Sequence, residues 1–366
     1  MTVRIINADV MDGLRQLPDE SVHCCVSSPP YWGLRNYGVD GQLGLESTFG
    51  EHLDKLVAVF REVRRALHSD GTLWLNYGDS YAGSWGAQSR GDEPGPASAL
   101  SGGQVHAAPK GTHTGSMKRT PGLKPKDLIG MPWRLAFALQ ADGWWLRSDI
   151  IWAKPNPMPE SVTDRPTKSH EYVFLLTKSE RYFYDAEAIK EKAEYAGPNS
   201  PASQASPYGQ GFTRRADELK RIGAKGNANG FRGGSYVNGE PGKRTKRGNT
   251  KPAEVEADGT APLSRNKRSV WSIATAPFPE AHFATFPPAI PEICIKAGCP
   301  VGGTVLDPFG GAGTTGLVAD RLQRNAILIE LNPEYAAMAE KRINKDRGAL
   351  LDLMEANESE GVLTAT

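Results

Sequence analysis

The stretch LDPFGGAGTTG, Leu306 to Gly316, joins an apolar segment predicted as a strand (304–309) to an amphipathic segment predicted as a helix (316–323). Glycines at such a junction let the backbone turn sharply and approach a ligand, and the N-terminus of the following helix offers free N–H groups to an anionic group. A further apolar segment (325–332) carries Glu330 near its end, where a carboxylate can accept hydrogen bonds from both hydroxyls of a ribose. These residues predict an α/β fold with a site for a nucleoside-containing cofactor.

The glycine stretch by itself is compatible with more than one ligand. Gly311 to Gly316 also satisfies the GxGxxG pattern, and Glu330 lies near the offset expected for NAD binding. No Gly-Lys-Ser or Gly-Lys-Thr follows, which excludes a Walker A phosphate loop. A plain glycine turn in an α/β unit is the structural alternative.

Predicted strands and helices alternate outward from this stretch, which is typical of an α/β protein with a doubly wound, mostly parallel Rossmann-like sheet. The apolar run VHCCVSS, which ends at Pro29 and Pro30, indicates a strand buried on both faces. Strands are expected at 3–10, 22–28, 72–78, 144–155 and 172–179, and helices at 11–21, 51–68, 127–141, 287–298 and 333–344.

Two segments interrupt the alternation. Residues 82–126 contain nine glycines and no periodicity, which indicates a long loop. Between Gly211 and Lys251 there are eleven Lys or Arg against three Asp or Glu, so residues 190–268 are predicted as a loop-rich basic insertion that contacts a polyanion, or else as a surface linker. We therefore divide the chain into 1–189, 190–268, 269–345 and a flexible tail at 346–366.

The composition limits the classes of protein to which the chain can belong. Its 366 residues carry a net charge of +1, which excludes a globally basic DNA-coating protein, so any nucleic-acid contact has to be local. The four cysteines have no metal-ligand spacing, and we expect neither a metal site nor a disulfide framework. No signal segment opens the chain and no apolar run approaches about 18 residues, so we expect a cytoplasmic protein without a membrane partner.

A second motif, SSPPYWGLRNYG (27–38), follows the predicted buried strand. Pro29 and Pro30 stiffen the loop, and its fixed carbonyls, the Ser28 hydroxyl and the Tyr31 ring can together hold a planar amine. The acceptors can take the two amine hydrogens while the ring stacks on the base. A proline turn that only caps a strand is the alternative at this point.

Together the two motifs resemble those of the S-adenosylmethionine-dependent amino DNA methyltransferases. The catalytic tetrad of that family, (D/N/S)-P-P-(Y/F), is matched by residues 28–31, and its cofactor motif, D-P-F-x-G-x-G-T-T, by residues 307–315. The tetrad comes first, the basic segment next and the cofactor motif last, an order similar to that of the permuted β group. The resemblance covers about 1–189 and 270–345. It implies S-adenosylmethionine as cofactor, S-adenosylhomocysteine as product, and double-stranded DNA as substrate.

The resemblance also implies roles for individual residues. The tetrad would hold a target base that is flipped out of the duplex. Asp9 would contact the adenine of the cofactor, Glu330 its ribose, and Phe286 would close the methionine side of the pocket. The N-terminal strand would lie beside the strand of Glu330. The implied cofactor-binding residues are Asp9, Phe286, Asp307, Phe309, Gly310, Gly311, Gly313, Thr314 and Glu330.

Contacts with DNA are expected from the segment after the tetrad and from the basic insertion. For Trp32 and Arg35 the alternative is simple packing of the loop. Outside the motifs, His170-Glu171 is interpreted as structural, and Asp79 as a residue that could approach the pocket. The candidate DNA-contacting residues are Trp32, Arg35, Arg232, Lys243, Arg244, Lys246 and Arg247.

The first tetrad residue bears on which base is methylated. In the family a serine at this position is commoner among cytosine-N4 enzymes and an aspartate among adenine-N6 enzymes, so Ser28 favours cytosine, with adenine as the alternative. A Pro-Cys dipeptide is absent, which argues against methylation of the cytosine ring carbon. Remoter alternatives are an NAD-dependent oxidoreductase, an inactive binding module, and an RNA or protein amine methyltransferase. A homodimer, a cognate restriction endonuclease and association with the nucleoid are further expectations.

Overall fold

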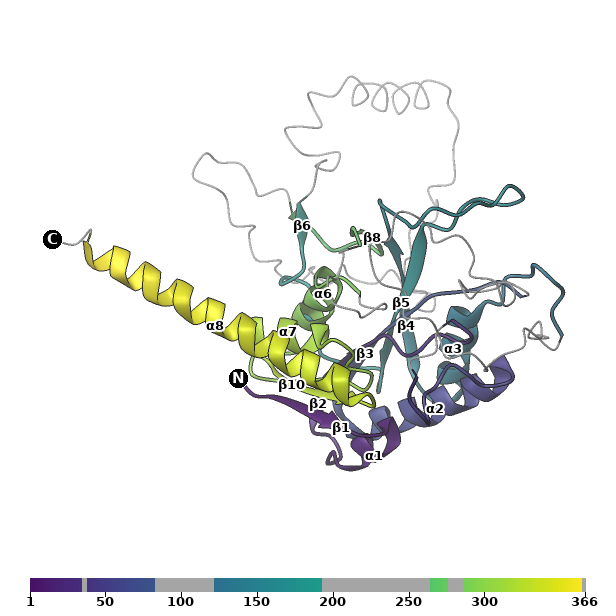
Figure 1. Cartoon of the computed structure of the whole chain (residues 1–366), viewed down its shortest axis with the longest axis horizontal. Coiled ribbons are helices and arrows are strands. Elements are labelled where there is room, and N and C mark those ends of the chain that lie inside the picture. Colours follow the sequence, from purple (N-terminus) through teal and green to yellow (C-terminus); the bar gives the residue numbers. More distant parts are fainter. Residues whose placement is uncertain (35–37, 83–121, 193–263, 276–285, 364–366) are drawn as a thin grey trace, which may run out of the picture. The chain divides into compact units, whose positions relative to one another are not determined.

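A sheet of eight strands organises most of the chain, in a computed structural model that describes residues 1–34, 38–82, 122–192, 264–275 and 286–363 (Figure 1). The strand order is β1-β10-β9-β2-β3-β5-β4-β8. Neighbours from β1 to β3 are parallel, β5 is antiparallel to β3 and β4, and β8 is parallel to β4, so the predicted mostly parallel sheet is confirmed. The strands are β1 (Val3–Asn7), β2 (Val22–Ser27), β3 (Leu67–Tyr77), β4 (Trp145–Ala153), β5 (His170–Thr177), β8 (Val270–Ser272), β9 (Thr304–Asp307) and β10 (Asn325–Glu330).

The first strand of the chain lies beside the strand that carries Glu330, as predicted. β1 and β10 pair in register from Val3 with Ala326 to Asn7 with Glu330. Beyond the paired residues, Ala8 N donates a hydrogen bond to Glu330 O (3.1 Å). The N-terminal strand thus reaches the same edge of the sheet as the glycine turn.

Helices cover both faces of this sheet (Figure 1). Three helices from the first half pack on a core that includes Cys25 and Leu73, and three from the second half on a core that includes Cys24 and Trp74. Adjacent residues of β2 and β3 therefore point to opposite buried faces, which explains why these strands are apolar without alternation. The helices are α1 (Val10–Arg15), α2 (Phe49–Ala66), α3 (Met131–Ala141), α6 (Ala289–Gly298), α7 (Thr314–Arg321) and α8 (Pro333–Leu363).

The start of β3 differs from the sequence-based prediction. The strand begins at Leu67, directly after α2, and not after a turn at Asp70-Gly71. Leu67 is fully buried and pairs with Val22 of β2, and the register then shifts before Cys24. Burial of Leu67 between the helix and the sheet therefore extends the strand backwards past the polar turn residues.

Most of the segment expected to form a flexible tail, 346–366, belongs to α8, which continues to Leu363. Arg347 forms an ion pair with Asp320 of α7 (2.7 Å), and Asp346 pairs with Arg321 of the same helix. A polar sequence does not exclude a helix when it is rich in Ala, Leu, Glu and Met, which are good helix formers.

A second unit, Lys190–Lys267, is distinct from the unit formed by Met1–Ile189 and Arg268–Thr366. In it, β6 (Glu191–Lys192) and β7 (Ser264–Arg265) pair antiparallel, and Arg265 donates a hydrogen bond to the Glu191 carboxylate (2.8 Å). In the described ranges no helix is long and apolar enough to cross a membrane. The candidate DNA-contacting residues that lie outside the described part are Arg35, Arg232, Lys243, Arg244, Lys246 and Arg247.

Candidate active site

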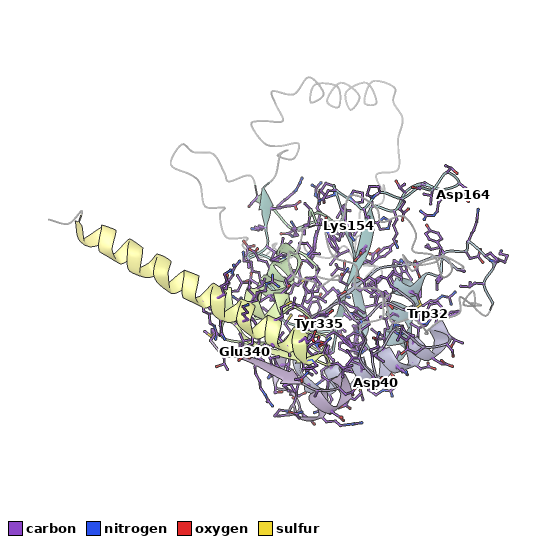
Figure 2. All side chains as sticks on the ribbon, in the orientation of Figure 1. Trp32, Asp40, Lys154, Asp164, Tyr335 and Glu340 are labelled. Atoms are coloured by element: carbon purple, nitrogen blue, oxygen red, sulfur yellow. The ribbon has the colours of Figure 1, made fainter. Side chains whose placement is uncertain are left out.

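A cavity of about 300 Å³ lies at the carboxyl ends of β1, β10, β9 and β2, the edge at which open α/β sheets bind their ligands. Figure 2 shows Lys154, just after β4, and Tyr335, near the start of α8, lying apart from each other; both line the cavity, which extends between them. The predicted residues in its lining are Asp9, Ser28, Pro29, Pro30, Tyr31, Phe286, Asp307, Phe309, Gly310, Gly311, Thr314 and Glu330.

The buried side chain of Asp307 stabilises the turn after β9 by hydrogen bonds. It is 2% exposed. Its Oδ1 accepts hydrogen bonds from Ser27 Oγ (2.7 Å) and Phe309 N (3.1 Å), and its Oδ2 accepts one from Thr315 Oγ1 (2.7 Å). Burial raises the pKa of Asp307 to about 7, although these donors oppose the shift. The carboxyl group thus ties β2, β9 and α7 together beside the cavity.

Glu330 holds the same turn from the end of β10. Its Oε2 accepts a hydrogen bond from Gly311 N and its Oε1 one from Asn332 N, both at 2.8 Å. Burial raises the pKa of Glu330, and the backbone donors oppose this shift. A carboxylate has about four acceptor positions, so Glu330 can still accept hydrogen bonds from a ligand such as a ribose.

Three further predicted residues line the cavity and also support its walls. Asp9 caps α1, since its Oδ1 accepts a hydrogen bond from Met11 N (2.8 Å). Thr314 Oγ1 accepts one from Arg342 of α8 (2.9 Å). Phe286 is half-buried against the core that α6, α7 and α8 cover.

Gly313 is absent from the lining, although the sequence predicts it as a cofactor-binding residue. Its φ is +75°, and a Cβ atom at this position would lie 2.7 Å from Ala339 Cβ. Glycine is therefore required here for α7 to begin close against α8, and Gly313 acts on the cavity only through that packing.

The tetrad lies within a polar network. Ser28 Oγ donates to Tyr31 Oη (3.3 Å), which lies 2.9 Å from Glu171 Oε2 and 3.2 Å from Asn76 Oδ1. Asn76 Nδ2 donates to the same Glu171 oxygen (3.2 Å), and Lys154 forms an ion pair with the other carboxylate oxygen. All five residues line the cavity. The network therefore joins the tetrad to groups from β3, β5 and the end of β4.

Sequence reasoning does not identify Asn76, Lys154 or Glu171 as site residues. Glu171 and Tyr31 are 140 positions apart in the chain. The antiparallel pairing of β5 with β3 places the start of β5 at the carboxyl end of β3, and this brings the two residues together. The available signal was that Lys154 and Glu171, which carry opposite charges, stand at the two ends of the connection between β4 and β5. This signal is weak.

A buried chain of polar groups lies behind the tetrad. His52 Nδ1 is 2.8 Å from Glu46 Oε2, and His52 Nε2 is 2.9 Å from Tyr77 Oη, which also accepts a hydrogen bond from Trp32 N (3.0 Å). Burial lowers the pKa of His52, which keeps its ring neutral at pH 7. The Tyr77 ring lies 4.6 Å from the Tyr31 ring. This chain therefore positions the tetrad from the protein side.

Trp32 and Asp79, which the sequence analysis considers as residues near the site, contact other parts of the protein. Trp32 is 5% exposed and its indole N–H donates to Glu46 O (3.0 Å), so its ring is enclosed by the protein and the loop-packing alternative holds for it. Asp79 is not in the cavity lining. Its Oδ1 accepts hydrogen bonds from Gly130 N (2.9 Å) and Met131 N (3.1 Å), because the free N–H groups at the start of α3 attract a carboxylate.

Comparison with known proteins assigns the family. The sequence model N6_N4_Mtase, described as DNA methylase, matches residues 22–341. The chain belongs to this DNA methylase family. The methyltransferase is 42% identical over 340 residues to the type II methyltransferase M.Cfr9I of Citrobacter freundii (93% of this chain, 87% of the relative). It is 43% identical over 345 residues to M.SmaI of Serratia marcescens (94% of this chain, 91% of the relative).

Solved structures share the fold of this methyltransferase. The cytosine-N4-specific PvuII DNA methyltransferase has a TM-score of 0.54 at 17% identity, over 96% of this chain and 94% of that one. TTHA0409 of Thermus thermophilus, complexed with S-adenosyl-L-methionine, has a TM-score of 0.50 at 20% identity, over 94% of each chain.

These findings confirm the predicted class of enzyme. The protein is an amino-DNA methyltransferase, as its family and its type II methyltransferase relatives show. S-adenosyl-L-methionine, the cofactor that the sequence motifs imply, is bound in the TTHA0409 structure that shares its fold. The donor set of the cavity fits this cofactor, since carboxyl groups and aromatic rings face one space. Within the residues that the structure describes, no cluster of three His, Cys, Asp or Glu side chains could hold a metal ion.

Proposed function

We propose that the methyltransferase modifies N4 of cytosine in double-stranded DNA. Ser28 carries the proposal, because the first tetrad position offers a neutral hydroxyl beside the Pro29 carbonyl in the cavity, and not a carboxylate. A hydroxyl can accept an amine hydrogen and has a proton of its own to pass on, whereas an ionised carboxylate only accepts. The PvuII methyltransferase, which has the same fold, is named cytosine-N4-specific.

The residues at the carboxyl ends of β1, β9 and β10 would hold S-adenosylmethionine. Glu330 would accept hydrogen bonds from the ribose, Asp9 would contact the adenine, and Phe286 and Phe309 would border the methionine part. When bound, the cofactor supplies a methyl group on a positively charged sulfur. Asp307 would act mainly by fixing the turn, since its two oxygens already accept three hydrogen bonds.

The tetrad would prepare the target amine for attack. The lone pair of an exocyclic amine is delocalised into the base, so the amine is a poor nucleophile. Ser28 Oγ and the Pro29 carbonyl would accept its hydrogens and orient the lone pair toward the methyl group, by positioning and electrostatics. The base would be flipped out of the duplex and stacked on the Tyr31 ring, which the Tyr77 ring supports from behind at 4.6 Å.

We assign target recognition to residues 190–268. The whole chain has a net charge of only +1, so the basic side chains of this segment form a local excess that suits phosphate contacts. Arg35, which follows the tetrad, would add a contact beside the flipped base. We also propose a cognate restriction endonuclease with the same target sequence, in keeping with the type II names of the relatives. The basic side chains proposed to contact phosphates are Arg232, Lys243, Arg244, Lys246 and Arg247.

Nucleoside mass spectrometry tests the choice of base. The protein is incubated with S-adenosylmethionine and unmethylated DNA of diverse sequence, and the digested DNA is searched for methylated bases. We expect N4-methylcytosine. N6-methyladenine would overturn the base assignment, and the absence of any methylated base would contradict the proposal as a whole.

Ser28→Ala tests the role of the tetrad. We expect methyl transfer to fall about 100-fold, which is typical when a group that acts on the proton of a reacting atom is removed. Titration calorimetry should show unchanged binding of S-adenosylmethionine. Ser69→Ala, at an exposed serine near the other end of β3, is the matched control. Equal turnover of the Ser28 variant and the control would contradict the assigned role.

A further inference from the structure

Three side chains form a directed chain of hydrogen bonds that leads away from the cavity. Ser28 Oγ donates to Tyr31 Oη (3.3 Å), and Tyr31 Oη, at 2.9 Å, can donate to Glu171 Oε2. Because the Ser28 hydroxyl donates its hydrogen to Tyr31, its Oγ can act only as an acceptor toward the cavity that it lines. The order of donors and acceptors therefore runs from the position of the target amine to a carboxylate.

The surroundings of Glu171 suit a carboxylate at the end of such a chain. Lys154 forms an ion pair with one oxygen, and Asn76 Nδ2 donates to the other (3.2 Å). Asn76 Nδ2 also donates to Tyr172 O (3.0 Å), which fixes the orientation of its amide. Lys154 Nζ lies 4.2 Å from the centre of the Trp152 ring, a cation–π contact that further limits its position.

Tyr31 remains a phenol in this setting. Its burial, and next the charge of Glu171, raise the pKa of Tyr31 well above its ordinary value. Its hydroxyl therefore keeps a proton to pass on and does not compete with Glu171 for the negative charge.

Other carboxyl groups near the cavity are engaged elsewhere. Asp307 and Glu330 accept hydrogen bonds from the glycine turn and its neighbours, and Asp79 caps α3. Among the described residues, the carboxylate in hydrogen-bond contact with a tetrad side chain is that of Glu171.

We propose that Glu171 takes up the proton that the target amine loses on methylation, through the hydroxyls of Ser28 and Tyr31. This inference rests on the proposed function, in which Ser28 Oγ accepts a hydrogen of the amine. Glu171 acts through Tyr31 and is a positioning and relay residue, held in place by Lys154.

The step balances in atoms and electrons. The amine nitrogen uses its lone pair to bond the methyl carbon, while the carbon–sulfur bond breaks and its electrons stay on sulfur. The nitrogen, now cationic, gives one proton to Ser28 Oγ, the Ser28 proton moves to Tyr31 Oη, and the Tyr31 proton moves to Glu171 Oε2. The product amine is neutral and both hydroxyls are restored. Glu171, whose side chain is 18% exposed, then returns the proton to solvent.

Glu171→Gln tests the relay, because glutamine keeps the shape of the side chain but does not take up the proton. We expect the single-turnover rate of methylation to fall about 100-fold, with the affinities for DNA and for S-adenosylmethionine unchanged. Tyr31→Phe keeps the stacking ring, removes the hydroxyl and leaves Lys154 and Glu171 paired, and its rate should fall similarly. Glu180→Gln, at an exposed carboxylate beyond the other end of β5, is the matched control.

The pH dependence distinguishes a relay from a structural role. The charged groups that face Glu171 are Lys154, at the end of β4, and Lys168, in the segment before β5, which in turn faces Asp79. Because the relay delivers a proton to the Glu171 carboxylate, we expect the wild-type single-turnover rate to fall as the pH is lowered. The Glu171→Gln variant should be flat over the same range.

Each outcome decides a separate claim. A Glu171→Gln rate close to that of the control, or an unchanged loss of rate at acid pH, overturns the relay and leaves the base assignment standing. If the wild-type protein methylates no DNA, the proposed function is contradicted, and so is the relay that rests on it. If Glu171→Gln does not fold, Tyr31→Phe decides, and a rate close to wild type overturns the relay.

Discussion

Buried carboxyl groups beside the cavity couple the stability of the methyltransferase to pH. Burial raises the pKa of Asp307 from its ordinary value of 3.8 to about 7, and it shifts the pKa of Glu330 in the same direction. Between pH 3.8 and about pH 7 the folded chain holds a proton on Asp307 that the unfolded chain has released. The folded state therefore loses stability as the pH rises from about 4 to about 7.

Asp307→Asn should remove this pH dependence. Because asparagine carries no charge to bury, we expect the variant to gain stability relative to wild type as the pH rises, by up to about 1.4 kcal/mol for each unit of the pKa shift. Urea unfolding of both proteins without cofactor, at pH 5 and at pH 8, measures the effect. A difference in unfolding free energy that is the same at both pH values would contradict it.

The contact between α7 and α8 sets the geometry of the glycine turn. Gly313 has a φ of +75° and would place a Cβ atom 2.7 Å from Ala339 Cβ of α8. Gly302 has a similar φ of +77° but nothing within 4 Å of its Cβ position. The two glycines thus separate the cost of a left-handed backbone from the cost of a steric clash.

Gly302→Ala should cost about 1–2 kcal/mol of unfolding free energy, from the backbone alone. Gly313→Ala should cost at least about 1 kcal/mol more, because overpacking adds to the backbone term, and it should weaken binding of S-adenosylmethionine by shifting the turn. Urea unfolding and titration calorimetry of both variants check this. Equal losses in the two variants would show that the approach of α7 to α8 does not constrain Gly313.

The division into two units gives the methyltransferase a sheet unit that carries the cavity and a separate unit at 190–267. The separate unit begins and ends in an antiparallel pair, in which Lys192 lies opposite Ser264. Because a two-residue turn can close such a pair, residues 193–263 can be replaced without stretching the chain.

Replacing residues 193–263 by Asn-Gly should leave a folded protein that binds S-adenosylmethionine with wild-type affinity. It should lose site-specific methylation and most of the salt-dependent affinity for DNA, since the basic side chains of this segment are removed. Calorimetry, and DNA binding at several salt concentrations, measure both effects. Retained site-specific methylation would place target recognition in the sheet unit.

Local sequence determined every strand of the main sheet except β8, most helices and both motif loops. Apolar runs, helical spacing and glycine or proline punctuation act over a few residues, so they are visible without a fold. That the two motifs act together was implied by the family resemblance, and the structure places residues from both in one cavity at the carboxyl ends of parallel strands.

Tertiary structure alone decided the rest. Glu171 meets Tyr31, and Lys154 meets Glu171, only because β5 runs antiparallel between β3 and β4. Trp32 is buried, and its indole N–H donates to Glu46 O. The role of Gly313 depends on how closely α8 approaches α7, and Asp346 and Arg347 of α8 form ion pairs with α7. Such contacts join residues far apart in the chain, and strand order and register, which create them, leave no periodic signal in the sequence.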